Sequence, residues 1–408
     1  MLEHEIYSVS SDSASLVFSG GALKTKEADS SGGYGIRVLH DGRIGFSHCQ
    51  TDSDIKKTII EAKKASSFSK ETAFQFVQKS SPKTINIFDK SLNHLDPSEL
   101  KDYVDLCRSS AESQGGKSRI ICSTNVSSIN LENTSGFSGK YKKSHFSIYA
   151  ECMHGDGFGF AYYSSIKKPD GALVSDVGTK AAAMAKNMKG AQKPEPGNYL
   201  LVVNPEALGS IMGPFLASFS GDWKRRGITK ITKTKLFSDM LSIYEDGTAL
   251  ATGARPFDDE GVKSEKKPLV ENGTVKSFMY DLETAALEGV KESGCCSRAS
   301  YSSSPSIGSS NLLVKEGRCK DLVELGRHIE LISAHGSHTA NLTSGDIGLE
   351  VSNAFLVDKG EKKPIKGFML TTNLFELFAN IEEIESKQHV YDNLISPRIA
   401  FRNVKVVS

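Results

Sequence analysis

The chain has 408 residues, which at about 150 residues per domain predicts two or three domains rather than one small core. Its 50 basic and 49 acidic side chains give a formal net charge of +1, which argues against nucleic acid as a partner and against an acidic tail. Hydrophobic residues make up 38%, and no apolar run approaches the roughly 20 residues that cross a bilayer. We therefore expect a soluble globular protein with no membrane partner.

The amino terminus and the cysteines point to an intracellular protein. Residues 1–5 are acidic and lack the basic and apolar regions of a secretory signal, so we expect a cytoplasmic location. The seven cysteines form an odd, scattered set with no CxxC pair, which argues against a disulfide framework and a thiolate zinc site. We expect them to be buried small hydrophobic residues, including the adjacent Cys295 and Cys296.

The first half of the chain predicts a sheet with helices. Asp41-Gly42 lies between two apolar runs and predicts a hairpin with a type I′ turn, in which both central residues have positive φ. An amphipathic pattern predicts a helix from about Asp54 to Ala65, with Ser53 as its N-cap. The other elements predicted here are strands over 6–9, 16–18, 36–39, 120–123, 128–131 and 140–152, and helices that begin at Asp96-Pro97 and cover 175–188.

A stretch with two prolines and a glycine, residues 192–197, predicts a linker at 191–197 between domains 1–190 and 198–408. The elements predicted beyond it are a strand over 199–203, helices over 205–218, 282–290 and 374–384, hairpins at 271–274 and 359–360, a mobile serine-rich loop over 297–310 and an edge strand over 398–406. The fold class is therefore α+β. It combines an N-terminal mixed sheet with helices and a C-terminal, mostly antiparallel β domain that is barrel- or sandwich-like.

Three short motifs are candidates for a metal, nucleotide or nucleic-acid site. His335-Gly336-Ser337-His338 is the nearest approach to a metal motif, but the glycine breaks it and we expect two loop histidines. The glycines of 155–159 run into another apolar stretch rather than a helix, which indicates a hairpin turn and not a nucleotide-binding loop. The basic cluster at 223–226 is typical of an exposed turn.

The segment Arg255–Gly261 places three consecutive carboxylates beside an arginine. Like charges in close contact disfavour ionisation unless something binds or pairs them. On these grounds alone the segment is either an exposed acidic turn or a site where the carboxylates are paired.

That acidic segment also begins a series of motifs that resembles the TldD/PmbA family. The motifs occur in the family's order from about residue 3 to 407, so the resemblance covers nearly the whole chain. They are GYGIRV at 33–38, DGRIGF at 41–46, FDDEG at 257–261, LVENG at 269–273, KSFMYD at 276–281, NAFLV at 353–357 and PIKG at 364–367.

The resemblance implies a two-domain α+β fold and a cytoplasmic zinc metallopeptidase built from two related subunits. TldD holds the zinc on a helix that reads HExxxH, with a cysteine near its carboxy terminus, whereas TldE, also called PmbA, lacks these ligands. The corresponding helix here has Gly213 and Ser218 at the histidine positions and Pro214 at the glutamate. These residues supply no imidazole and no carboxylate base, and no cysteine follows Cys319. The resemblance therefore implies a TldE/PmbA-type chain without catalytic or metal-binding residues.

Our main hypothesis is a non-catalytic subunit that pairs with a TldD-like chain, or with itself. It would form part of the wall of a peptide channel around the partner's zinc. The substrate would be a peptide or an unfolded protein, and this chain would carry no cofactor. Arg255, Phe257, Asp258, Asp259 and Glu260 are the candidate substrate-binding or interface residues.

Two alternatives stay open. The first is an active metallopeptidase with a non-standard site at His335 and His338, which falls short of the three protein ligands usual for catalytic zinc. The second is a binding protein that acts on DNA gyrase, suggested by the family's older label, modulator of DNA gyrase. A chain with a net charge of +1 offers little for direct DNA binding.

Overall fold

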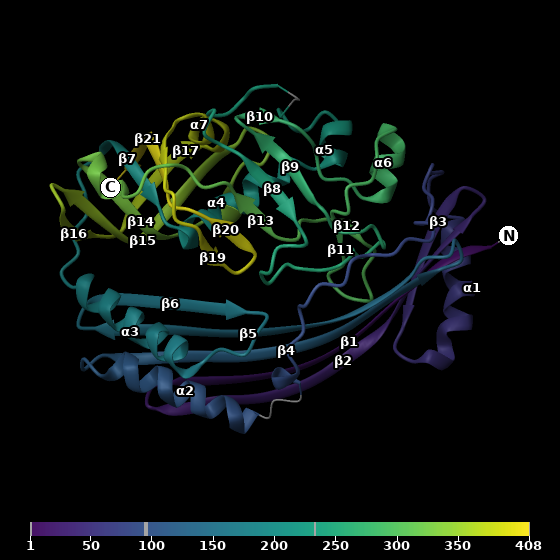
Figure 1. The fold of residues 1–408 in the computed structure, drawn as a ribbon, viewed down its shortest axis with the longest axis horizontal. Coiled ribbons are helices and arrows are strands. Elements are labelled where there is room, and N and C mark those ends of the chain that lie inside the picture. Colours follow the sequence, from purple (N-terminus) through teal and green to yellow (C-terminus); the bar gives the residue numbers. More distant parts are fainter. Residues whose placement is uncertain (1, 94–96, 232–233, 408) are drawn as a thin grey trace.

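A computed structural model of the chain describes residues 2–93, 97–231 and 234–407. Strands hold 43% of the residues and helices 22%, so the α+β class is confirmed. A long curved sheet forms one layer, two helices lie beneath it, and a strand-rich half of the chain lies over its concave side (Figure 1). The domain boundary at 191–197 stays a prediction. Every helix in the described part of the chain is too short or too polar to cross a lipid bilayer.

The N-terminal layer is a six-stranded antiparallel sheet with the strand order β3-β2-β1-β4-β5-β6. The Asp41-Gly42 hairpin is confirmed, since these residues have φ of 50° and 68° and connect His40 to Arg43. The two strands expected at 120–123 and 128–131 are one, because β1 and β5 pair with β4 along its length. The strands are β1 (Glu3–Ser19), β2 (Ala22–His40), β3 (Arg43–Cys49), β4 (Lys117–Asn133), β5 (Ser138–His154) and β6 (Gly157–Ser165).

Two helices, α2 (Pro97–Glu112) and α3 (Gly171–Asn187), cover the convex face of this sheet (Figure 1). Even-numbered residues of the central strands, such as Cys122 and Phe146, pack with these helices in one buried cluster. Successive side chains of a strand point to opposite faces, so the odd-numbered residues face the concave side. The expected hairpin turn is confirmed at Gly155-Asp156, which connects His154 to its partner Gly157, and Gly157 and Gly159 belong to β6.

Helix α1 (Ile55–Ser66) packs against β2 and β3 and follows a 3₁₀ turn, η1 (Asp52–Asp54). The expected N-cap at Ser53 is wrong, because Ser53 lies inside that turn and Asp54 precedes the helix. A Cβ at Gly45 would lie 1.8 Å from the carbonyl oxygen of Ala62, so this glycine lets α1 approach β3. Asp96, expected to cap α2, lies outside the described residues.

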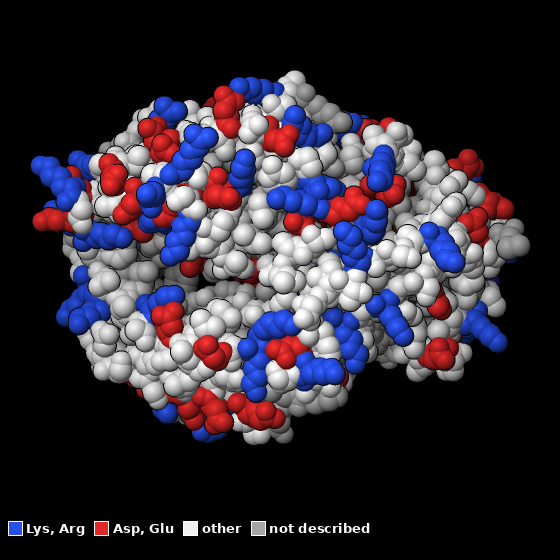
Figure 2. Space-filling model, in the orientation of Figure 1, with Lys and Arg blue, Asp and Glu red and all other residues white. Residues whose placement is uncertain are grey.

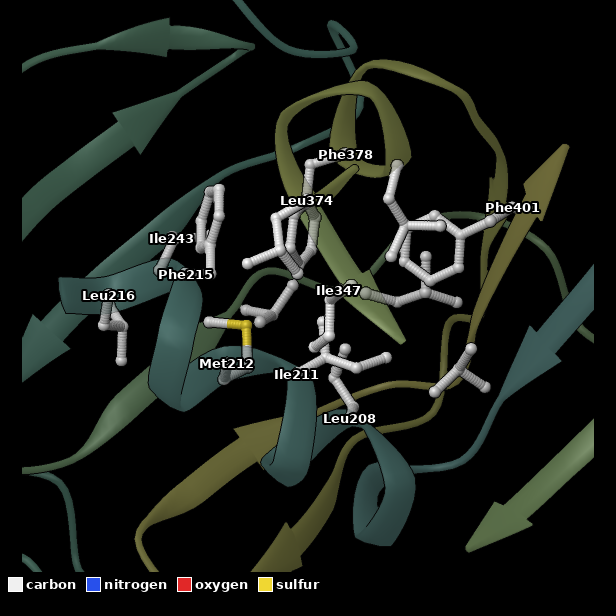
Figure 3. Packing of buried hydrophobic residues seen from close by; sticks show 14 of the residues in the cluster. Leu208, Ile211, Met212, Phe215, Leu216, Ile243, Ile347, Leu374, Phe378 and Phe401 are labelled. Atoms are coloured by element: carbon white, nitrogen blue, oxygen red, sulfur yellow. The ribbon is translucent and has the colours of Figure 1, made fainter. Parts of the chain in front are cut away.

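The C-terminal half contains a closed five-stranded barrel with the order β14-β7-β21-β17-β15, in which β15 pairs back with β14. Helix α4 (Pro205–Ala217) inserts Leu208, Ile211 and Phe215 into the barrel's main apolar cluster, as Figure 3 shows. The ring centroids of Phe215 and Phe378 lie 4.2 Å apart. The strands of this sheet are β7 (Gly197–Val203), β14 (His328–His335), β15 (Asp346–Asp358), β16 (Glu361–Ile365), β17 (Phe368–Asn373), β18 (Ile381–Ile384) and β21 (Ile399–Val407).

A second C-terminal sheet has the order β10-β9-β8-β13-β20-β19, and a separate ribbon pairs β11 with β12. The hairpins at 271–274 and 359–360 are confirmed, since Asn272, Gly273, Lys359 and Gly360 all have positive φ at strand ends. The bounds are β8 (Ile243–Asp246), β9 (Lys266–Glu271), β10 (Thr274–Val275), β11 (Cys296–Ser297), β12 (Ser306–Ile307), β13 (Leu312–Val314), β19 (His389–Tyr391) and β20 (Leu394–Ser396).

Several expectations for this half are wrong. The strand at 398–406 is not an edge strand, because β21 pairs with both β7 and β17 inside the barrel. The helix expected over 374–384 ends early, as α7 (Leu374–Ala379), and 381–384 form β18 on β21. The basic cluster at 223–226 overlaps a short helix, α5 (Gly221–Arg225), rather than a turn.

The serine-rich segment 297–310 is not a free loop. Its ends pair as β11 and β12, and the ring of Tyr301 packs directly over Gly33 of β2. The helix expected over 282–290 is α6 (Leu282–Glu288). Five of the seven cysteines are buried as expected, whereas Cys49 and Cys319 are partly exposed.

Candidate functional site in the cleft between the two halves

A cleft separates the concave face of the N-terminal sheet from the C-terminal half, and it is visible as a hollow in Figure 2. A cavity of about 500 Å³, the central cavity, and an adjoining cavity of about 220 Å³ are lined by residues of both halves and occupy it. These two cavities share Thr252 and Asp392. A third cavity, of about 740 Å³, is lined only by residues of the N-terminal half, and most of its strand residues, such as Ser8 and Lys142, are even-numbered and face away from the cleft. The two cavities of the cleft therefore form one continuous channel along the sheet.

The floor of this channel is polar because the odd-numbered strand residues that face it carry hydroxyl and amide groups. The amide of Asn125 donates to the Ser11 hydroxyl at 2.6 Å, and the Ser127 hydroxyl donates to Asn125 Oδ1 at 2.7 Å. The hydroxyls of Ser123 and Ser147 lie 2.8 Å apart. Each of these groups keeps further donor or acceptor capacity for a ligand. A row of such groups along a strand suits the backbone of an extended peptide.

The central cavity, of about 500 Å³, gathers titratable side chains from both halves of the chain. Lys143 and His145 come from β5, and Asp392 comes from the turn between β19 and β20, where its φ is 55°. Burial and the nearby Arg255 lower the pKa of Lys143 to about 8. Burial also lowers the pKa of His145, while Asp392 partly opposes that shift.

The acidic segment lies beside this cavity and is buried. Asp258 is fully buried, and Arg255, Phe257, Asp259 and Glu260 are each at most 9% exposed. The Phe257 ring packs edge-on against Tyr141 of β5, with the ring centroids 5.1 Å apart. The interpretation of this segment as an exposed acidic turn is wrong, because the N-terminal sheet covers it and its carboxylates have partners in the fold.

Each carboxylate of the segment has its own set of donors. Asp258 accepts hydrogen bonds from the backbone amides of Glu260, Val262 and Cys296 at 2.9 to 3.1 Å. Asp259 accepts from the Arg298 amide at 2.7 Å. Even so, burial and the neighbouring Glu260 raise the pKa of Asp258 to about 7.

Glu260 joins a buried ion network that ties the two halves of the chain together. Arg37 of β2 donates to both carboxylate oxygens of Glu5 at 2.9 Å and to Glu260 at 2.6 Å. Arg298 donates to Glu5 at 2.6 Å. Glu260 also accepts from the Leu282 amide at 2.8 Å. Segment 255–260 is therefore an internal interface, and its role toward a substrate or another subunit stays a prediction.

The positions that the family resemblance assigns to the zinc motif lie on α4 and at its C-cap. Gly213 is exposed, with open space where a Cβ would be, Pro214 is half-buried inside the helix, and Ser218 is buried at its C-cap. These three residues do not fit a catalytic zinc, since none offers an imidazole or a carboxylate. His335 and His338 are both exposed at the end of β14. Across residues 2–93, 97–231 and 234–407, no group of three or more His, Cys, Asp and Glu side chains is placed to hold a metal ion.

Lys143, His145 and Asp392 are not among the residues predicted from the sequence. Period-two alternation over the strand expected at 140–152 places Tyr141, Lys143 and His145 on one face. A strand face this polar is unusual and could have indicated a functional site. Asp392 carried no such signal, because only the tertiary fold brings its turn over β5.

The family of the chain follows from comparison with known proteins. Residues 196–408 match the PmbA/TldA metallopeptidase C-terminal domain, and residues 4–66 match PmbA/TldA metallopeptidase domain 1. Because the C-terminal match alone covers more than half of the chain, this protein belongs to the PmbA/TldD metallopeptidase family.

Relatives and solved structures agree with that family. The chain is 28% identical to an uncharacterized protein of Methanocaldococcus jannaschii, over 98% of this chain and 95% of that protein. It is 31% identical to the metalloprotease TldD homolog of Buchnera aphidicola, over 40% of this chain and 35% of that protein. The structure of TldE from Thermococcus kodakarensis covers all of this chain and 97% of its own, with a TM-score of 0.91 at 21% identity. A Thermotoga maritima protein described as a candidate modulator of a DNA gyrase covers all of this chain and 96% of its own, with a TM-score of 0.92 at 21% identity. At such identities the likeness shows the fold.

Proposed function

We propose that this chain is a non-catalytic, TldE/PmbA-like subunit of a two-chain cytoplasmic zinc metallopeptidase that acts on peptides or unfolded proteins. The observation that carries the proposal is the chemistry of α4, where Gly213, Pro214 and Ser218 stand at the ligand positions of the family's zinc motif. The zinc belongs to a TldD-like partner, in which it would activate the attacking water. This chain supplies part of the peptide channel.

The contribution of this chain to catalysis is positioning. Hydroxyl and amide groups such as those of Asn125 and Ser127 line the cleft and can hydrogen-bond the backbone of an extended peptide without regard to its side chains. Ordered binding and exclusion of water lower the barrier for a reaction whose metal is held elsewhere. A cleft of this kind suits an unfolded substrate, because a folded protein does not offer an extended backbone.

Reconstitution tests the proposal. We purify the chain from a host without any TldD homologue and assay it on casein and unfolded peptides, with and without added zinc. The chain alone should leave these substrates intact, and turnover should arise only when a TldD-like chain is added. A chelator should abolish that turnover, because the metal of the partner does the chemistry.

Two further readouts separate this proposal from an active peptidase. The double variant His335→Ala, His338→Ala should leave the reconstituted activity unchanged. Sedimentation should give a homodimer for the chain alone and a heterodimer on mixing. Chelator-sensitive turnover that coelutes with the chain alone would contradict the proposal, as would a 44 kDa monomer that forms no complex.

A further inference from the structure

Two cationic side chains in the central cavity have unused donors. Within the described residues, the Lys143 ammonium has no hydrogen bond and no ion pair, although it lines the cavity. Arg255, only 7% exposed, uses Nη1 to donate to the Cys296 carbonyl at 2.8 Å, while its Nε and Nη2 are buried without a partner. Buried cations are normally paired, so this arrangement is costly in the unliganded chain.

The carboxylates of the cavity are engaged elsewhere. Asp259 accepts from the Arg298 amide at 2.7 Å, and Asp392 accepts from the Thr252 hydroxyl at 2.6 Å. Among the residues that the structure describes, neither forms an ion pair with Lys143. Both lie close enough to favour the charged lysine electrostatically, while burial and Arg255 disfavour it. The cavity therefore holds a positive group that lacks a counter-charge in direct contact.

We propose that Lys143, supported by Arg255, forms a carboxylate-binding subsite in the channel, and that the carboxylate belongs to a peptide bound there. The inference rests on the proposed function, since it assigns the chemistry of the peptide that the channel would take. The carboxylate comes either from the C-terminus of the peptide or from an Asp or Glu side chain. Asn125 and Ser127 lie on the same wall and offer further polar contacts. Tyr7 and Tyr141 offer aromatic surface to the rest of the peptide.

Fluorescence anisotropy on the full chain tests this subsite with three labelled peptides of one unfolded sequence. The first ends in a free carboxylate, the second in an amide, and the third in an amide with one internal glutamate. Lys143→Gln should weaken binding of the first peptide by about tenfold or more, the range for a lost hydrogen bond between charged groups, and leave the amide peptide unaffected. Lys143→Arg should retain most of the affinity.

A matched control is Lys117→Gln, an exposed lysine on the neighbouring strand β4 that lines none of the three cavities. It should bind all peptides like the parent. Lys143→Gln should also melt no lower than the parent, because Lys143 leaves no partner unpaired.

Affinity for the free carboxylate should fall as the pH rises from 7 to 9.5 and the lysine loses its proton. Arg255, Asp259, Asp392, His145 and Tyr141 are the charged and titratable groups that face Lys143.

The peptides also identify the source of the carboxylate. If Lys143→Gln weakens binding of only the first peptide, the subsite binds a C-terminal carboxylate. If it also weakens binding of the third peptide, the subsite binds a carboxylate side chain. If Lys143→Gln binds the carboxylate and amide peptides as the parent does, the subsite is overturned while the peptide channel stands. If the parent chain binds none of the three peptides, both the subsite and the channel are overturned.

Discussion

Removal of Arg37 should destabilise this protein far more than removal of a comparable surface arginine. Arg37 is 4% exposed and makes three hydrogen bonds to two carboxylates, two with Glu5 and one with Glu260. Its guanidinium also lies 4.9 Å from the centroid of the Phe74 ring. The variant Arg37→Met keeps much of the side-chain volume but leaves two buried carboxylates short of a counter-charge.

The expected cost follows from that geometry. Removal of one partner of a buried ion pair typically costs about 3 to 5 kcal/mol, against about 5 to 15 kcal/mol for the whole stability of a domain. Arg37→Lys should cost less but still be measurable, because an ammonium cannot reproduce the planar two-pronged contact with Glu5. Arg298 still donates to Glu5 in either variant, so Glu260 should carry most of the penalty.

Urea unfolding and thermal melting, followed by circular dichroism, measure this effect. Arg43→Met is the matched control, since Arg43 lies on the adjacent strand β3 and pairs with exposed Glu71 at 3.2 Å. A surface pair of this kind contributes about 0 to 1 kcal/mol, so the control should unfold close to the parent. Equal unfolding midpoints for the parent, Arg37→Met and Arg43→Met would refute the argument that this network stabilises the contact between the halves.

Three further predictions concern the acidic segment and the metal. The double variant Asp258→Ala, Asp259→Ala should lose at least about 2 kcal/mol of stability, because buried backbone amides lose their acceptors; a melting curve and elution volume that match the parent would reject this. The pKa of Asp258 is raised to about 7 in the folded state, so the folded chain keeps the proton to higher pH than the unfolded chain, and stability from this group is lost as the pH rises through 7. The unfolding free energy of Asp258→Asn should therefore rise relative to that of the parent between pH 5.5 and 8. A difference between the two that stays constant over this range would contradict the raised pKa of Asp258. Elemental analysis of the purified chain should find no stoichiometric zinc, and about one zinc per chain that is lost in His335→Ala, His338→Ala would overturn that expectation.

The sequence by itself determined the local structure of this protein. The turns at Asp41-Gly42 and Asn272-Gly273 were predictable because few residue pairs adopt positive φ without strain. The amphipathic pattern of α1 and the long alternating run of β5 likewise depend on neighbours in sequence, as does the α+β class that such elements imply. The sequence motifs, taken together, also indicated the relationship to the TldD/PmbA family, which no single helix or strand shows.

Only the tertiary structure decided which of these elements are covered and which charges are paired. Alternation identifies β21 as a strand but does not reveal that β7 and β17 flank it in a closed barrel. In the sequence, three consecutive carboxylates are typical of a solvated turn. In the folded chain Arg37, more than 200 residues away in sequence, donates a hydrogen bond to Glu260 and pairs with it. Lys143 and Asp392 likewise meet in one cavity only because the two halves close over the concave sheet. Local preferences act over a few residues, whereas burial and ion pairing depend on contacts between distant segments, and those contacts exist only once the chain has folded.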